Sequence, residues 1–345
     1  MLWLTPVLML PTSSCAMTGT PPGVSRWESQ MTYYGEKYCN EIRDRSTSGE
    51  KQLADTYYDA ERVYYQIADY TGDRRWTVCA DAAEKAYRDD YLFRHNGKLP
   101  GFWVFPHGLF MDYKRTQDVR SKDALLLLAQ NAAFANVGGY PQEWIVGAEA
   151  SREVAYNLSI KLLANEAGAS YGKEITHFAD LALGHIDQWF VSKTAKYIQP
   201  FMVGLTAEAL IAYHEKTNDP RVLPAIRTAM DGLWDRLWIS REDAFLYIDR
   251  AVDVAGGREA VAPAPDLNLL IAPAFAWLYA QTGDSKYRER GDKIFAGGVS
   301  QAAVGFDAKQ FNQNYRWSFD YLRWRKQAEA AKAIKPPSGQ QTTQR

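Results

Sequence analysis

The stretch FMVGLTAEALIAYHEKTNDPRVLPAIRTAMDGLWDRL (residues 201–237) contains two helical patterns of different kinds, joined by a short turn. Residues 201–215 are apolar on almost every side, which is typical of a helix that is buried all round. Residues 222–237 place their apolar side chains on one stripe and leave the charged ones for water. The stretch therefore predicts an inner helix, a tight turn and an outer helix.

The turn in this stretch, TNDPRV (217–222), recurs three times, as TGDRRW (71–76), TQDVRS (116–121) and TGDSKY (282–287). Gly or Asn at the second position suits the left-handed conformation that ends a helix. The aspartate that follows suits the N-cap of the next helix. A signal that recurs along the chain in this way predicts a repeated helical hairpin.

Extending this rule along the chain gives an all-α fold. Inner helices are expected near 53–71, 103–116, 147–166, 199–217, 266–282 and 313–326, and outer helices near 73–92, 119–136, 173–191, 219–238 and 284–297. The third turn (165–174) lacks the Thr-x-Asp signature, and the amphipathic segment 25–45 can close the ring as the sixth outer helix. We predict an (α/α)6 toroid of six inner and six outer helices. The alternative, an open α-solenoid, fits less well because the repeat is irregular and its inner helices are apolar on all faces.

Both ends of the chain differ from this pattern. Residues 1–24 form an apolar run followed by small residues, which resembles a secretory leader without its basic start. We expect a secreted or periplasmic protein, with Cys15 as a possible lipoprotein acceptor, or a cytoplasmic one if this run is not a signal. The run is too short to span a membrane. Residues 25–326 would form one toroidal domain, and residues 327–345 a polar, disordered tail.

Composition narrows the classes of function. A formal net charge of −1 argues against a nucleic-acid partner. The five histidines have no metal-ligand spacing, and neither a phosphate-binding loop nor a GxSxG motif occurs, so no metal and no cofactor are expected. Cys39 and Cys79 are either two free thiols or one disulfide.

The segments HGLFMDYKRTQD (107–118), ALIAYHEKTNDPR (209–221) and AFAWLYAQTGDSKYRERGDKIF (274–295) resemble the six-hairpin glycosidase-like superfamily. The resemblance covers nearly the whole chain from about residue 25. It implies a toroid and an activity on carbohydrates, either as a glycoside hydrolase or as a related polysaccharide lyase. No catalytic residue is transferred from it, because no family-defining catalytic motif is present.

The connections from outer to inner helices are long and varied, so we expect the functional site on their face of the ring. They interleave aromatic and planar polar side chains, which suit the faces and the hydroxyls of sugars, although each aromatic could instead pack a loop onto the rim. The predicted substrate-binding residues are Trp103, Tyr140, Trp144, Gln199, Asn268, Asn312, Tyr315, Arg316 and Trp317.

Two sets of catalytic candidates follow from the chemistry. Hydrolysis of a glycoside needs two carboxyl groups, for which we select Glu143 and Asp266. Elimination from a uronate needs a group that neutralises the carboxylate and a base, for which Arg152, Tyr156 and His107 are the candidates. We expect a glycoside hydrolase acting on a saccharide that contains acidic sugar. The alternatives are a polysaccharide lyase acting by β-elimination and a non-catalytic glycan-binding toroid.

Overall fold

The computed structural model describes residues 19–44, 46–254 and 257–334, and within them the chain is mainly helical, which confirms the predicted all-α class. Cys15, most of the predicted leader and the last part of the predicted tail lie outside the described residues. Among the described residues, no helix combines the length and the apolar character that crossing a membrane requires.

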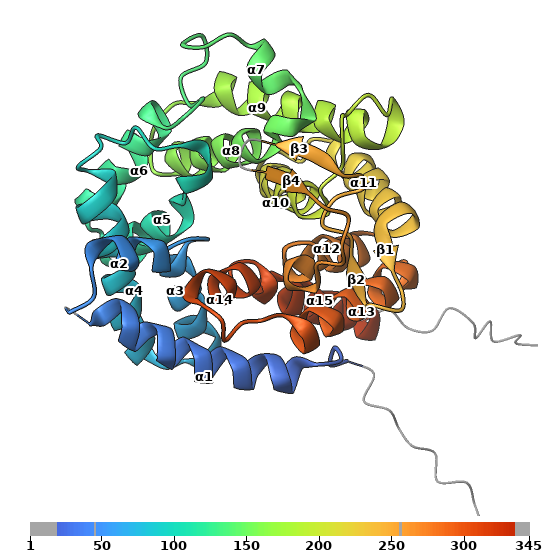
Figure 1. Ribbon diagram of the computed structural model, residues 1–345, viewed down its shortest axis with the longest axis horizontal. Coiled ribbons are helices and arrows are strands. Elements are labelled where there is room, and N and C mark those ends of the chain that lie inside the picture. Colours follow the sequence, from blue (N-terminus) through green and yellow to red (C-terminus); the bar gives the residue numbers. More distant parts are fainter. Residues whose placement is uncertain (1–18, 45, 255–256, 335–345) are drawn as a thin grey trace, which may run out of the picture.

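The predicted inner helices surround a common axis (Figure 1). Each contacts the next, from α3 through α5, α8, α10 and α12 to α15, and α14 contacts both α15 and α3. Their bounds are α3 Ala60–Thr71, α5 Pro106–Thr116, α8 Ser151–Glu166, α10 Pro200–Thr217, α12 Ala272–Thr282, α14 Ala308–Tyr315 and α15 Ser318–Ile334. In α12 every residue from 272 to 279 is buried, as the all-round apolar pattern predicts.

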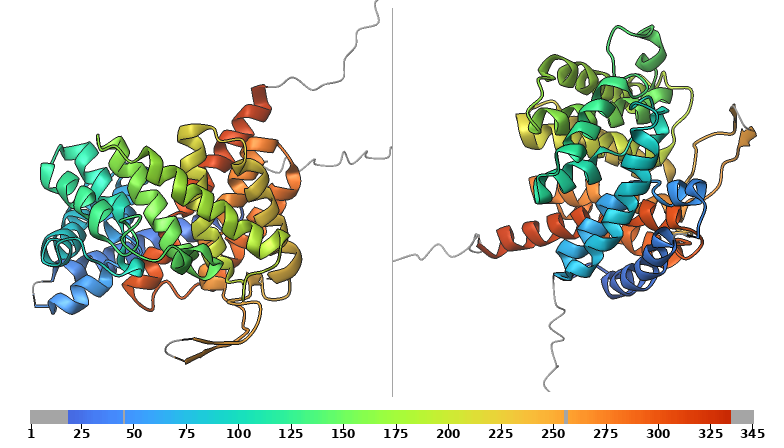
Figure 2. Two further views of the ribbon diagram at one scale, coloured as in Figure 1. Left: turned by 90° about the horizontal axis from the view of Figure 1, so that it is seen from above. Right: turned by 90° about the vertical axis from the view of Figure 1, so that its left-hand side faces the viewer.

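The outer helices pack behind the inner ones (Figures 1 and 2). Their bounds are α1 Val24–Arg43, α4 Thr77–Glu84, α6 Val119–Asn131, α9 Gly172–Ile186, α11 Val222–Leu237 and α13 Ser285–Gln301. A short 3-10 turn, η1 (Arg74–Trp76), precedes α4, and π-helical turns extend α4 and α9 as η2 (Lys85–Leu92) and η5 (Asp187–Val191). Pairs α3–α4, α5–α6, α8–α9, α10–α11 and α12–α13 are in contact, so each inner helix meets the outer helix that follows it.

The recurrent Thr-x-Asp turns close these pairs with one set of hydrogen bonds. In the first turn Thr71 Oγ1 donates to Ile67 O (2.7 Å) and accepts from Asp73 N (3.2 Å). Asp73 Oδ1 accepts from Arg75 N (2.9 Å), which satisfies a free donor at the start of the next helix. Gly72 has a φ of 71° and ends α3 in the left-handed conformation. The turns at 116–118, 217–219 and 282–284 repeat these contacts.

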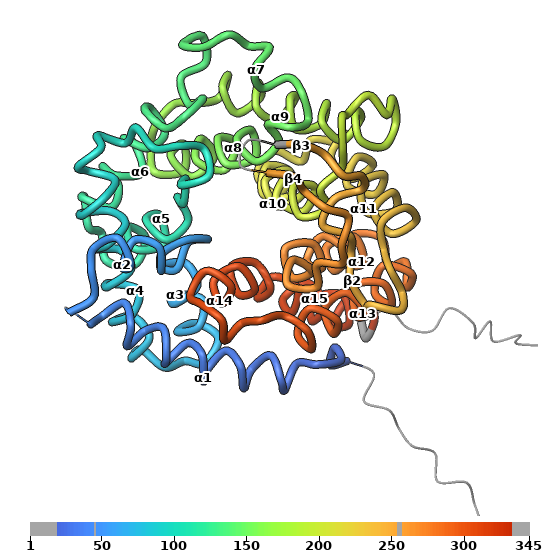
Figure 3. The backbone as a smooth tube through the Cα atoms, in the orientation of Figure 1, coloured from blue at the N-terminus to red at the C-terminus, as the bar shows by residue number. Residues whose placement is uncertain are grey.

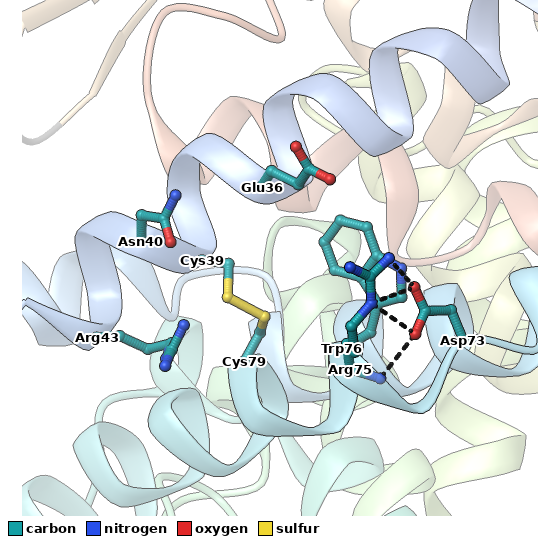
Figure 4. A pocket seen from close by; sticks show the side chains of 8 residues that line it. All are labelled: Glu36, Cys39, Asn40, Arg43, Asp73, Arg75, Trp76 and Cys79. Atoms are coloured by element: carbon teal, nitrogen blue, oxygen red, sulfur yellow. Dashed lines mark hydrogen bonds and ion pairs between the residues drawn. A yellow bond between two sulfur atoms is a disulfide. The ribbon is translucent and has the colours of Figure 1, made fainter.

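Helix α1 lies across the start and the end of the ring. Its Trp27 is fully buried and donates from Nε1 to Ser318 Oγ (3.0 Å) at the start of α15. A disulfide joins Cys39 of α1 to Cys79 of α4, so the alternative of two free thiols is wrong. Figure 4 shows this disulfide beside a cavity of about 220 Å³, near Trp76 and the Asp73–Arg75 pair.

Several boundaries differ from the prediction. The sixth inner helix, predicted near 313–326, is divided between α14 and α15, and the fifth begins with the 3-10 helix η6 (Pro265–Leu270) before α12. The segment predicted as one helix from 53 is broken: α2 (Gly49–Asp55) ends early, and Tyr58 and Asp59 take left-handed conformations before α3 begins. Helix α15 continues to residue 334, beyond the predicted limit at 326, because Arg325 pairs with Asp292 and Glu329 and so fixes this turn.

The outer-to-inner connections contain the remaining elements. They are η3 Gly101–Trp103, α7 Glu143–Val146, η4 Ala148–Ala150, β1 Trp238–Ile239, β2 Ala244–Phe245, β3 Val252–Val254, β4 Gly257–Glu259 and η6 Pro265–Leu270. Strand β1 pairs with β2 and β3 pairs with β4, both antiparallel. The β3–β4 hairpin extends away from the helices in Figure 2, and the tube in Figure 3 shows it beside the central axis.

Candidate functional site

Three inner segments bring a buried ion triad together in the middle of the ring. Glu208 of α10 accepts from Arg62 Nη1 of α3 (2.6 Å) and from Arg316 Nη2 at the α14–α15 junction (2.8 Å). All three side chains are at most 7% exposed. Burying charges is costly unless they are paired, so this geometry depends on all three partners. We call Arg62, Glu208 and Arg316 the central triad.

Tyr156 of α8 extends the triad. Its hydroxyl accepts from Arg316 Nη1 (3.3 Å), the one hydrogen bond of this hydroxyl among the described residues. Burial raises the pKa of Tyr156, although Arg316 and Arg152 oppose the shift. The phenol is therefore protonated at neutral pH, and its proton remains available for donation. Arg316 Nε is buried without a hydrogen-bond partner among the described residues, which leaves a second donor unused.

The break between α2 and α3 positions Asp59 and His107. Asp59, with a φ of 67°, caps α3 by accepting from Arg62 N (3.2 Å), and it also accepts from the backbone of His107 (3.1 Å) and Gly108 (3.2 Å). A non-glycine residue at positive φ costs of order 1–3 kcal/mol, so such a conformation persists only where its surroundings hold it. Asn312 of α14 holds this segment by donating to the carbonyls of residues 55 and 57.

His107 lies at the start of α5 with a side chain that is 20% exposed. Its Nδ1 is 3.8 Å from Asp59 Oδ2, which is too long for a hydrogen bond. Burial, with Arg62 and Arg316 nearby, holds the pKa of His107 well below its usual range. The imidazole is therefore neutral at physiological pH and can accept a proton.

Aromatic rings separate this centre from the surface. Tyr57 packs edge-on against Trp103 (4.9 Å between centroids) and Phe105 (5.3 Å). Phe105 in turn lies 6.3 Å from the Tyr156 ring. Arg152 pairs with its neighbour Glu153 (2.9 Å) and remains 27% exposed. The centre is thus bordered by flat apolar faces and by one accessible guanidinium.

Of the predicted catalytic residues, Tyr156 contacts Arg316 directly, and His107 lies beside Asp59, which caps the helix that carries Arg62. Arg152 pairs with Glu153. Glu143 and Asp266 share no hydrogen bond or ion pair among the described residues. Glu143 is exposed on α7, which packs on α8, α9 and η4, whereas Asp266 lies in η6 and accepts from Gln313 of α14 (2.8 Å to its carbonyl oxygen). The two residues therefore lie in elements that pack on different helices, and the carboxyl pair stays a prediction.

Four predicted substrate-binding residues serve the core instead. Asn268 is fully buried and donates to two backbone carbonyls, and Asn312 has the structural role described above. Tyr315 donates to Trp27 O (2.7 Å), and Trp317 is 2% exposed and packs on Trp324. The prediction that Asn268, Asn312, Tyr315 and Trp317 bind substrate is corrected. Both amides and both aromatic rings are already engaged in contacts within the protein.

The other predicted binding residues fall in two places. Trp103 borders the central residues, and half-buried Gln199 directly precedes α10. Tyr140 packs on Phe134 (5.1 Å), and Trp144 is 62% exposed on α7, next to Glu143. Tyr140 and Trp144 therefore belong to the outer sector of α7 and α9.

Sequence reasoning missed Glu208, Arg62 and Asp59. A signal existed for Glu208, because it is the one charged residue in the apolar run 200–213 of α10 and must find a buried partner. Arg62 is likewise a charge on a helix whose neighbours are buried. The partner of each could not be read from the sequence, since the paired residues lie 108 and 146 positions apart.

A second buried cluster lies beside the turn at 116–118. Oxygens of Glu84, Asp112 and Asp118 lie within 4.8 Å of one another, a spacing that a metal ion could use. Arg88 Nη1 already contacts Asp118 (2.9 Å), Ser121 (2.7 Å) and Glu84, so a guanidinium supplies positive charge at this position. Burial raises the pKa of Glu84 to about 7. This cluster links α4–η2, α5 and α6 and is a structural element.

In comparisons with known proteins, no family model, no curated protein and no solved structure matches this chain.

Proposed function

We propose that the helices form an (α/α)6 toroid. The contacts that run from α3 through α5, α8, α10 and α12 to α14–α15 and back to α3 support a closed inner ring. Helix α1, which contacts α4, α13 and α14, would be the sixth outer helix. All inner helices then start on the face of the long connections, where their N-terminal dipole ends favour bound anions.

We infer that the protein is a carbohydrate-active enzyme that cleaves an acidic saccharide in the centre of this ring, by β-elimination rather than by hydrolysis. The observation that carries this choice is the hydrogen bond between protonated Tyr156 and Arg316 of the central triad. A neutral His107 beside Asp59, the cap of the helix that carries Arg62, supplies the base. The lyase was the alternative at the level of sequence. It moves ahead because Tyr156 contacts Arg316 of the central triad, whereas Glu143 and Asp266 share no hydrogen bond or ion pair among the described residues.

In the proposed reaction, an unprotonated nitrogen of His107 accepts the proton from C5 of a uronate ring. The electron pair of that C–H bond forms the C4–C5 double bond, the bond from C4 to the glycosidic oxygen breaks, and this oxygen takes the proton of Tyr156. This step requires a neutral His107 as the base and a protonated Tyr156 as the acid, which are the states described above. Proton exchange with water restores both residues.

The arginines would neutralise the substrate carboxylate, which makes the C5 proton more acidic. Arg316 Nε–H is a buried donor without a partner in the described part of the chain, and leaving such a donor unsatisfied costs about 1–3 kcal/mol. A carboxylate oxygen would satisfy it. A bound carboxylate would also raise the pKa of His107, because it opposes the charges of Arg62 and Arg316.

Hydrolysis remains the second candidate because carboxylates other than the predicted pair lie near the centre. Glu153 and Asp320 have partly exposed side chains (15% and 22%). Both already face an arginine, Arg152 at 2.9 Å and Arg62 at 3.8 Å. A non-catalytic glycan-binding toroid is the third candidate.

The test is an activity screen on uronate polymers, such as polygalacturonate and alginate, and on neutral polysaccharides. Reducing ends and the ultraviolet absorbance of the unsaturated product are followed together. Elimination predicts that both signals rise on a uronate polymer. Reducing ends without absorbance would favour hydrolysis, and binding without either signal would favour the glycan-binding toroid.

The Cys39–Cys79 disulfide supports the proposal that the protein is secreted or periplasmic, since stable disulfides are rare in reducing compartments.

A further inference from the structure

A pocket outside the central triad opens between four segments of the long-connection face. It has a volume of about 440 Å³, within the range of ~300–1,000 Å³ typical of small-molecule sites. Lys51 and Asp55 of α2, Tyr57, Phe102 and Trp103 of η3, and Lys309 of α14 line it. The pocket is therefore lined by segments that lie far apart along the chain, from α2 to α14.

Its aromatic wall connects it to the proposed centre of reaction. Phe102 is 40% exposed, and Trp103 packs edge-on against Tyr57. Tyr57 also packs against Phe105 (5.3 Å between centroids), which lies 6.3 Å from the Tyr156 ring, so these rings connect the pocket to the central residues. A sugar unit in the pocket would thus neighbour a unit placed at Tyr156.

Two polar groups of the pocket are not satisfied by the protein. Asp55 is 5% exposed, and its Oδ2 has no hydrogen-bond partner among the described residues, although its Oδ1 contacts Lys51. Buried acceptors are nearly always paired, so a donor from a ligand, such as a sugar hydroxyl, is the natural partner.

The second group is Lys309. Its ammonium lies 5.5 Å from the centroid of the Tyr57 ring and forms no ion pair within the described part of the chain. The other two charges of the pocket are already engaged: Lys51 pairs with Asp55, and Asp307 caps α14 by accepting from Gln310 N (2.7 Å). Within the described residues, Lys309 is therefore the cation of the pocket that has no ion pair, whereas Lys51 pairs with Asp55.

We propose that this pocket binds a single carboxylated pyranose, a hexuronate unit, as a subsite next to the bond that is cleaved. The aromatic wall stacks against the C–H face of the ring, Asp55 Oδ2 accepts from a hydroxyl, and Lys309 pairs with the carboxylate. The inference rests on the proposed function for its place next to the scissile bond. The binding itself does not require catalysis.

The test uses isothermal titration calorimetry of the full chain with D-glucuronate and, separately, D-glucose. These sugars differ only in the group at C6, and neither has a glycosidic bond to cleave. We expect glucuronate to bind about fivefold more tightly, which corresponds to one partly exposed charge pair. Lys309→Ala should abolish this preference for glucuronate. Trp103→Ala should weaken the binding of both sugars about tenfold.

The matched control is Lys293→Ala, which removes an exposed lysine of α13 outside the pocket and should change neither affinity. Equal affinities in the unaltered protein, a preference that survives Lys309→Ala, or no binding of either sugar would each overturn the subsite. If glucuronate binds but no uronate polymer yields an unsaturated product, the subsite is supported and the proposed elimination is overturned.

Discussion

The two ends of the inner helices are built in different ways. At the turn end, Thr217 and Asp219 make their hydrogen bonds within six residues of the chain. At the opposite end, Glu208 reaches Arg62 and Arg316 over 146 and 108 residues, and Arg316 reaches Tyr156 over 160. A turn of this kind can form in a short segment alone, whereas the central triad exists only when the ring is complete.

The energetic consequences differ as well. Capping groups at the turns are partly exposed and can exchange their partners for water. The charges of the triad are buried, so the loss of one leaves another uncompensated. Apart from the buried cluster beside the 116–118 turn, the turn end therefore contributes stability in small separate amounts, whereas the triad concentrates stability and the proposed chemistry in the same few residues.

The largest expected effect is at the triad. Glu208→Gln removes the charge that both guanidiniums share and should lower the free energy of unfolding by about 3–5 kcal/mol in urea titrations. The matched control is Glu166→Gln, which breaks the surface pair with Lys216 and should cost at most about 1 kcal/mol. Equal losses of unfolding free energy in the two variants would contradict the energetic difference between the triad and the turn end.

A smaller effect is expected from pH at the cluster beside the 116–118 turn. The pKa of Glu84 is raised to about 7 in the folded protein, above its unfolded value near 4.5, so its contribution is fully present below pH 4.5. That contribution is lost as the pH rises through about 7, by up to about 3 kcal/mol. Glu84→Gln should flatten the dependence of unfolding free energy on pH between these values. An unchanged slope would show that Glu84 titrates normally.

The smallest effect is expected at a single turn. Asp284→Ala removes the side chain that accepts from Lys286 N (3.0 Å) and should cost about 1 kcal/mol of unfolding free energy. Activity on a uronate polymer should not change, because the turn lies at the end of α12 away from the triad. A loss of activity in a variant that remains folded would mean that the turn end takes part in function.

The same contrast explains which features the sequence could predict. Helix positions and the Asp-capped turns depend on neighbours within a few residues, so their prediction is confirmed from Thr71 to Asp284. The run from Tyr315 to Trp317 is different. Arg316 joins the triad while Tyr315 and Trp317 enter the core, because the chain changes direction between α14 and α15. Local patterns do not determine that break, and they do not identify partners such as Glu208 or the support that Asn312 gives to residues 55–57.

The most direct test of the central claim is the initial rate of unsaturated product formation from a uronate polymer by Tyr156→Phe, measured beside Asp284→Ala. Both variants should fold. We predict that Tyr156→Phe lowers the rate by about 10²–10⁴, as expected for the loss of a general acid, while Asp284→Ala retains the rate of the unaltered protein. A Tyr156→Phe variant that keeps the full rate would contradict the assignment of the reaction to the centre of the ring.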